Sequence, residues 1–196
     1  MKKTILTLMM LIIMATAFVM AEEGKLIITA GGGGSEFDGK TAGTISASAG
    51  TNIKPWLEVG ISMTAFHTLE RNYSDGMTPE KTYQAESGYA VFYLRPHFAL
   101  GNRFDIGFLL QSGSGTLLYR YEEKYRKDLV WTDEVLDQVT YGVSSIGMDI
   151  RFALCEKHSI TLSGSWRGTS PLKTPYADSD ALNGFTGELK YGWKLF

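Results

Sequence analysis

Residues 56–66 read WLEVGISMTAF, and apolar side chains alternate along this stretch with polar or glycine residues. The apolar positions run from Leu57 to Ala65 in steps of two, and the polar or glycine positions run from Glu58 to Thr64 in the same steps. A period of two is the geometry of a β-strand, because a helix repeats every 3.6 residues. The stretch therefore predicts a strand with one oily face and one polar face.

The same two-sided pattern recurs in FDIGFLLQ (104–111), SIGMDIRF (145–152), SITLSGSW (159–166) and ELKYGWKLF (188–196). Together with shorter and more glycine-rich segments, it predicts eight antiparallel strands. The strands are expected near Leu26 to Ser35, Ala42 to Thr51, Trp56 to Leu69, Gly88 to Leu100, Phe104 to Tyr119, Gln138 to Phe152, Ser159 to Gly168 and Gly184 to Phe196.

The connections between these segments alternate in length. NIKP, GNR and CEKH are tight turns, whereas the segments 71–87, 122–137 and 169–184 are long, polar and rich in aromatic residues. SEFDGK takes the remaining place in the long series but is itself short. In an up-and-down sheet every second connection falls at the same end, so the sequence predicts short turns at one end and mostly long loops at the other.

The N-terminal segment MKKTILTLMMLIIMATAFVMA (1–21) has the order of a secretory signal peptide. Two lysines come first, an apolar run follows, and small residues end the segment at Ala21. A membrane anchor is the alternative, but an apolar run of roughly 17 residues is short for a helix that crosses a bilayer. The sequence therefore predicts cleavage after Ala21 and one exported domain over residues 22–196.

Charge and cysteine content exclude some classes of function. The chain has 19 Lys and Arg residues and 21 Asp and Glu residues, and its formal net charge of -2 falls to about -4 when the two N-terminal lysines are removed. This mild acidity argues against a nucleic-acid partner. Cys155 is the single cysteine, so it forms no internal disulfide, and it is interpreted as a plain surface thiol.

Residues 34–41 read GSEFDGKT and match the phosphate-loop pattern G-x-x-x-x-G-K-[ST]. That pattern binds nucleotides only between a parallel strand and a helix, whereas the residues that follow here are strand-like. Glu36 and Asp38 would also repel a phosphate. Asp38 and Gly39 form the Asp-Gly signal of a β-hairpin turn, so the segment predicts a turn and no nucleotide cofactor.

An exported antiparallel meander can form a soluble sandwich or barrel or a transmembrane barrel, and periodicity alone does not decide between them. Strands of 9 to 11 residues or more suit a tilted bilayer crossing. Aromatic residues gather beside the short turns, as they do in interfacial girdles. Short turns at one end and long loops at the other are also the arrangement of outer-membrane barrels. These features favour the transmembrane barrel.

The signal peptide, strand number, turn asymmetry and terminal Phe196 together resemble the small eight-stranded outer-membrane β-barrel superfamily, the OmpA- and OmpX-like proteins of bacteria. The resemblance covers residues 22–196 and carries no catalytic motif. It implies an all-β, up-and-down transmembrane barrel in the bacterial outer membrane, in contact with membrane lipid, lipopolysaccharide and the barrel assembly machinery. The chain departs from the family at Phe196, which has the opposite phase from the outward residues Leu195 and Trp193.

If the oily faces contact lipid, the polar faces point into a barrel that is just wide enough to be filled by side chains. Buried charges persist when they are paired, so the sequence predicts an internal ion-pair network that fills the lumen. A small-solute, hydrophobic-compound or ion path through the lumen is the alternative. The predicted network is Glu58, Arg95, Asp105, Asp149, Arg151, Glu188, Lys190 and Lys194.

Aromatic residues interleaved with charges make good contact surfaces, and they occur in and beside the loop at 122–137. The sequence therefore predicts a non-enzymatic barrel that acts through its loops in adhesion, interaction with a host or surface ligand, or envelope integrity. The candidate contact residues are Tyr119, Tyr121, Tyr125 and Trp131.

An acyl-transfer enzyme that modifies lipid A is the alternative, because His67 precedes Ser74 and Asp75 in the next loop. His67, His97 and His158 are too scattered in sequence to predict a metal site, and they are interpreted as interfacial or turn histidines.

Overall fold

The structure is a computed structural model that describes residues 26–37, 39–67, 69–73, 81–121 and 135–195. The predicted signal peptide, residues 1–21, and the terminal Phe196 lie outside these residues. No helix in the described part of the chain is long and apolar enough to cross a membrane.

The described residues form one antiparallel sheet. Its strands are β1 (Leu26–Phe37), β2 (Lys40–Lys54), β3 (Leu57–Phe66), β4 (Leu69–Tyr73), β5 (Lys81–Leu100), β6 (Phe104–Tyr121), β7 (Val135–Ala153), β8 (His158–Thr169) and β9 (Gly184–Leu195).

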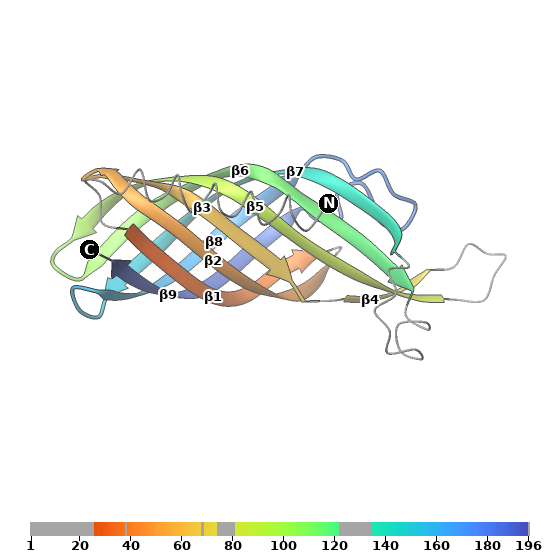
Figure 1. The fold of residues 1–196 in the computed structure, drawn as a ribbon, viewed down its shortest axis with the longest axis horizontal. Coiled ribbons are helices and arrows are strands. Elements are labelled where there is room, and N and C mark those ends of the chain that lie inside the picture. Colours follow the sequence, from red (N-terminus) through yellow and green to blue (C-terminus); the bar gives the residue numbers. More distant parts are fainter. Residues whose placement is uncertain (1–25, 38, 68, 74–80, 122–134, 196) are drawn as a thin grey trace.

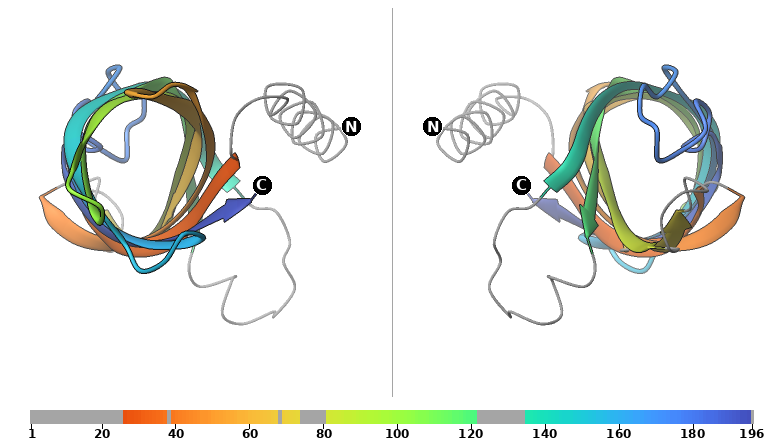
Figure 2. Two further views of the ribbon diagram at one scale, coloured as in Figure 1. Left: turned by 90° about the vertical axis from the view of Figure 1, so that its left-hand side faces the viewer. Right: turned by 90° about the vertical axis from the view of Figure 1, so that its right-hand side faces the viewer.

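The sheet closes into a barrel (Figures 1 and 2). Neighbouring strands follow the order β3-β2-β1-β9-β8-β7-β6-β5, and β3 pairs with β5 to complete the ring. The last strand, β9, lies beside the first, with Leu26 opposite Leu195. Closure leaves no free sheet edge around the ring, and eight strands occupy it, as the sequence predicted.

The predicted strand from Trp56 to Leu69 is divided in the structure. Both β3 and β4 pair with β5, and the pairing shifts by one residue between Ala65↔Gly88 and Leu69↔Ala85. β4 therefore continues the track of β3 beyond a local irregularity, and it adds no ninth position to the barrel wall.

The three longest strands each exceed their predicted length: β5 has 20 residues, β6 has 18 and β7 has 19. The segments 71–87 and 122–137 were predicted as loops, but β5 already begins at Lys81 and β7 at Val135. Beyond the apolar part of the wall, these strands turn polar residues such as Glu86 and Gln138 outward and residues such as Ala85 inward. In this part of the strands the polar side chains face outward and the apolar side chains face inward. An outward apolar face therefore no longer identifies the strand from the sequence.

The outer wall carries a broad apolar belt on the part of the barrel nearer the short turns. Large side chains are exposed there, including Phe92 at 72%, Leu162 at 60% and Trp166 at 56%, whereas the inward Thr29 and Ser62 are each 4% exposed. On β6 the belt ends at Leu110, and the next outward side chains are serines. An apolar outside and a polar inside are the arrangement of a barrel in a bilayer.

The β1–β2 connection settles the meaning of GSEFDGKT. Phe37 pairs with Lys40, so the turn contains two residues, and Gly39 has a φ of 67°. This left-handed conformation is one that glycine adopts without steric cost. The phosphate-loop match is therefore a hairpin turn between two antiparallel strands, as the sequence predicted.

Phe108 and Ser114 both point outward on β6, but Phe108 lies within the belt and Ser114 lies beyond it. We expect Phe108→Arg to lower the free energy of unfolding in lipid vesicles by about 2–4 kcal/mol, and Ser114→Arg to lower it by at most about 1 kcal/mol, because the cost of a charge decreases towards the interface. Urea titration of the vesicle-inserted barrel measures both values. Equal losses would show that the bilayer surrounds a different part of the wall.

Candidate functional site

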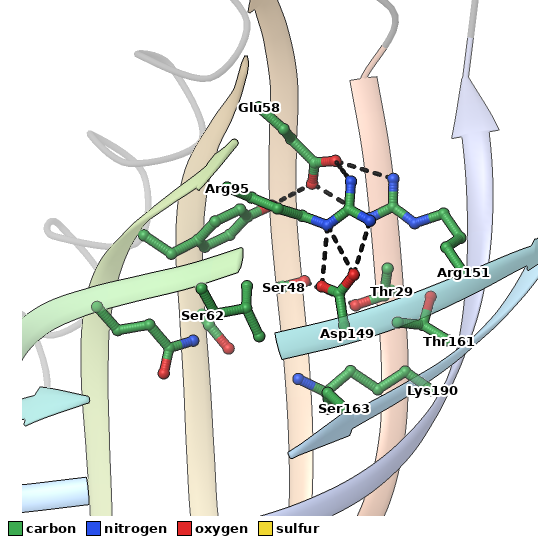
Figure 3. Close-up of a pocket in the computed structure, with 13 residues that line it drawn as sticks. Thr29, Ser48, Glu58, Ser62, Arg95, Asp149, Arg151, Thr161, Ser163 and Lys190 are labelled. Atoms are coloured by element: carbon green, nitrogen blue, oxygen red, sulfur yellow. Dashed lines mark hydrogen bonds and ion pairs between the residues drawn. The ribbon is translucent and has the colours of Figure 1, made fainter. Parts of the chain in front are cut away.

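Arg95 on β5 lies at the centre of a charged cluster inside the barrel, towards the short-turn end (Figure 3). Its Nε donates to both carboxylate oxygens of Asp149 at 2.9 Å, and its Nη2 donates to Asp149 Oδ1 at 2.6 Å. Nη2 also donates to Asp105, and Nη1 lies 3.6 Å from Oε2 of Glu58. One guanidinium, 1% exposed, thus joins four consecutive strands of the ring, β3, β5, β6 and β7, on the inner side of the wall.

Glu58 is the second centre of the cluster. Arg151 donates from Nη1 to Glu58 Oε2 at 2.8 Å and from Nη2 to Oε1 at 3.3 Å. The hydroxyl of Tyr93 donates to Oε1 at 2.8 Å. Both carboxylate oxygens are therefore hydrogen-bonded, which is the condition for holding a charge that is 1% exposed.

The structure brings five of the eight residues in the predicted network into one connected cluster: Glu58, Arg95, Asp105, Asp149 and Arg151. Glu188 and Lys190 form a separate pair along β9, with 2.7 Å between Lys190 Nζ and Glu188 Oε2. Lys194 forms no ion pair with any other residue that the structure describes. The predicted set is thus divided into a cluster, a pair and a separate lysine.

His97 belongs to the cluster, although the sequence analysis treated it as an interfacial or turn residue. Its Nδ1 lies 2.7 Å from Oδ2 of Asp105, and its side chain is 9% exposed. The signal for this position was present, because His97 follows Arg95 by two residues and so shares its face of β5. The cluster without His97 contains three carboxylates and two guanidinium groups.

Glycines on the inner wall make room for the large side chains of the cluster. A Cβ at Gly107 would collide with the Arg95 side chain, and a Cβ at Gly60 would meet the ring of Tyr93 at 2.7 Å. The remaining cavity at this level has a volume of about 30 Å³ and is lined by charged residues of the cluster together with Thr29 and Ser48. Such a volume holds about one or two water molecules, so side chains fill this part of the lumen.

The lumen is closed a second time at the loop end, by apolar side chains. Residues 170–183, between β8 and β9, bring Leu172 and Leu182 into the mouth, where they are 5% and 0% exposed. Thr174 Oγ1 donates to Asp137 Oδ2 at 2.6 Å. These residues pack with the inward side chains of the barrel wall, namely Phe37, Ala42, Phe66, Ala85, Val91, Leu117, Tyr119, Tyr141 and Val143.

Arg167 on β8 attaches this segment to the barrel. Its Nε donates to the carbonyl of Leu182 at 2.6 Å, its Nη2 to the carbonyl of Glu36 at 2.7 Å, and its Nη1 to Ser35 Oγ at 2.8 Å. The guanidinium carbon lies 4.7 Å from the ring centroid of Phe66. Arg167 is 1% exposed and forms no ion pair with a described carboxylate. Carbonyl oxygens, hydroxyls and an aromatic face stabilise its charge instead.

Sequence analysis missed Arg167, although it shares the inward phase of Ser163 on β8. Arg167 is held by backbone carbonyls of two segments, one predicted to be a turn and the other a long loop. Those partners are set by the tertiary fold and have no pattern in the sequence.

The loop-contact candidates are placed differently from the prediction. Tyr119 was expected at the surface, but it is 0% exposed inside the loop end of the barrel, where its ring centroid lies 5.3 Å from that of Tyr176. The inward phase of β6 continues to this residue, so the prediction was wrong. Tyr121 is the last residue of β6, and Tyr125 and Trp131 lie outside the described residues.

The alternative acyl-transfer site can be placed only in part. His67 follows β3, and its backbone N–H donates to the carbonyl of Gly43 at 2.7 Å, while Ser74 and Asp75 lie outside the described residues. Across the part of the chain that the structure describes, no group of His, Cys, Asp and Glu side chains is arranged to hold a metal ion.

No protein-family model matches the chain, and no curated protein sequence matches it significantly. Several solved structures, in contrast, are similar to it. Neisserial surface protein A has a TM-score of 0.56 at 11% identity, with 88% of this chain and 96% of that chain covered. Ail, the attachment invasion locus protein of Yersinia pestis, has a TM-score of 0.53 at 14% identity, with 88% and 99% covered.

Ail is also similar in its complex with the heparin analogue sucrose octasulfate, with a TM-score of 0.53 at 12% identity over 88% of this chain and 98% of that chain. These structures are small eight-stranded outer-membrane barrels, and the chain has their fold, as the resemblance implied. At such low identity the likeness shows the fold alone.

We expect Arg95→Ala to lower the free energy of unfolding by about 3–5 kcal/mol, because the substitution leaves buried carboxylates without their main cation. Urea titration of the vesicle-inserted barrel measures the loss. Asp149→Ala and the double variant complete a double-mutant cycle, and the double variant should be less unstable than the sum of the single losses. A loss below about 1 kcal/mol for Arg95→Ala would contradict a structural role for the cluster.

Arg167→Met should release residues 170–183 while the barrel remains folded. Hydrogen bonds from a charged donor contribute about 1.5–3 kcal/mol, so trypsin cleavage after Lys173 should become about tenfold faster or more. Arg120→Met is the matched control, because Arg120 pairs with Glu86 on a neighbouring strand at 3.4 Å. Equal cleavage rates for both variants would show that Arg167 does not hold the segment in place.

Proposed function

We propose that this chain is a non-enzymatic outer-membrane barrel with a closed lumen, and that it acts through its loop-end surface in attachment or another surface interaction. The observation that carries the proposal is the double closure of the lumen. The Arg95–Glu58 cluster fills the short-turn half, and the apolar residues beneath 170–183 fill the loop-end half. A barrel closed at both levels offers no open path for a solute, which argues against the channel alternative.

The apolar belt supports the membrane location. Exposed leucine, isoleucine and aromatic side chains surround the wall, and a contiguous apolar surface of this kind is stable in lipid and not in water. The fold shared with outer-membrane barrels, together with the predicted signal peptide, favours the outer membrane over the inner one.

The loop end supports a role in surface interaction. Strands β5, β6 and β7 continue past the apolar belt and carry polar outward side chains there, so the sheet extends beyond the membrane-facing part of the wall. The closed upper core packs against the inner face of this extension and makes it a firm support for the loops that it carries. A firm support lowers the conformational entropy lost when a partner binds.

Charge at the loop end bears on the class of ligand. Ail is known in complex with a heparin analogue, which is a polyanion. Among the residues that the structure describes at this end, the exposed lysines Lys40 and Lys173 are accompanied by the exposed acids Glu36, Asp178 and Asp180. Mixed charge of this kind favours a ligand recognised by aromatic and polar contacts over a polyanion.

Location is tested by cell fractionation and gel mobility. The mature protein should be recovered with outer membranes and should migrate faster before boiling than after it, because a closed hydrogen-bonded barrel resists detergent until it is heated. Recovery as a soluble periplasmic protein with no mobility shift would contradict the proposal.

The surface role is tested by adhesion of cells that produce the protein to immobilised host-matrix proteins. We expect Tyr125→Ser/Trp131→Ser to reduce adhesion, since aromatic side chains dominate contact energy at interfaces. Surface amount and heat-modifiable mobility serve as the folding control. Adhesion equal to that of cells lacking the protein would argue against this role and would leave the barrel's location unaffected.

A further inference from the structure

The three short turns carry an exposed cation each. Lys54 ends β2, Arg103 precedes β6, and Lys157 precedes β8, so all three lie at the end of the barrel drawn on the left in Figure 1. None of the three forms an ion pair with another residue that the structure describes. Among the described residues of these turns, Glu156 is the only exposed carboxylate.

Glu22, Glu23 and Lys25 adjoin the same end in sequence and lie outside the described residues. At the opposite end the exposed charges are mixed, with Lys40 and Lys173 beside Glu36, Asp178 and Asp180. The described surface is therefore basic on the short-turn side and slightly acidic on the loop side.

Each cation adjoins a large apolar side chain at the border of the belt. Trp56 is 57% exposed beside Lys54, Phe104 is 49% exposed beside Arg103, and Leu154 is 49% exposed on the turn of Lys157. An ammonium or guanidinium next to an exposed apolar side chain matches a phospholipid, because the phosphate and the acyl chain can be bound together.

We propose that the short-turn rim of the barrel binds anionic phospholipid headgroups, with Lys54, Arg103 and Lys157 on the phosphate and the neighbouring Trp56, Phe104 and Leu154 on the acyl chains. The proposal rests on the membrane location proposed above. Three exposed cations on separate turns give a distributed ring, which suits several lipids of one leaflet better than a single soluble anion.

The rim is tested with the purified, refolded barrel in nanodiscs of phosphatidylcholine that contain a minor fraction of phosphatidylglycerol. Spin-labelled forms of the two lipids report which one is immobilised by the protein. We expect the barrel to select phosphatidylglycerol. In Lys54→Gln/Lys157→Gln the selectivity should fall by about fivefold for each lysine removed, because each cation contributes about 1 kcal/mol. Added Arg103→Gln should lower it further, and 0.5 M salt should weaken it in the unmodified barrel.

Lys40→Gln/Lys173→Gln is the matched control, since it removes two exposed lysines from the loop end with the same change of net charge. It should leave the selectivity unchanged. Equal immobilisation of both lipids by the unmodified barrel, or an equal fall in both double variants, would overturn the proposal. Competition by millimolar inorganic phosphate would assign the cations to a soluble anion instead. A third outcome is that the unmodified barrel shows no lipid selectivity but binds purified cell-wall sacculi, and that Lys54→Gln/Lys157→Gln abolishes this binding. That outcome would assign the cations to the cell wall.

Insertion is measured separately by heat-modifiable mobility in the same nanodiscs. A barrel that inserts but does not select phosphatidylglycerol contradicts the rim proposal alone. A chain that does not insert at all contradicts the proposed function itself.

Discussion

The structure depends on the pairing of Arg95 with carboxylates inside the barrel. A guanidinium that is 1% exposed in a protein interior is stable only if acceptors surround it, and Asp149, Asp105 and Glu58 supply them from three other strands. These contacts link four consecutive strands of the ring, β3, β5, β6 and β7, and the Arg151–Glu58 pair joins the two outer strands of the four inside the lumen. A shift of one residue in the register of any of these strands would turn its charges towards lipid, so the cluster and the register of the wall require each other.

The two halves of the lumen are filled by side chains of different kinds. Near the short turns the inward side chains are charged and form ion pairs, and glycines such as Gly107 give them space. Near the loop end they are apolar, and residues 170–183 complete that core as Arg167 binds the carbonyls of Leu182 and Glu36. The view along the barrel in Figure 2 shows the segment at the rim of the ring. The barrel wall is therefore supported from inside at both levels, and its exposed charged groups lie at the two ends.

Much of the fold could be predicted because the bilayer imposes a simple rule on the wall: apolar side chains face the lipid, and the polar residues between them face the lumen. Alternation such as that of 56–66 gave the strands, and turn lengths gave the direction of the barrel. The rule stops where the strands leave the apolar belt, so the extensions of β5 and β7 were assigned to loops, and the burial of Tyr119 was missed for the same reason. Inside the lumen, phase alone placed Arg95 and Asp149 on the inner wall. Arg167 and His97 share the inward phase of their strands, but neither was predicted in the network. The acceptors of Arg167 are mainly backbone atoms of distant segments, and His97 was interpreted as an interfacial or turn histidine.

Single-channel recording of the purified barrel in planar bilayers tests the closed lumen most directly. Charged side chains fill one half and apolar side chains the other, so the account predicts no steady open-channel current in the unmodified protein, although its heat-modifiable mobility shows that it is folded. Discrete and reproducible current steps from such a folded barrel would show that an open path runs past Arg95 and Arg167, and would contradict the account.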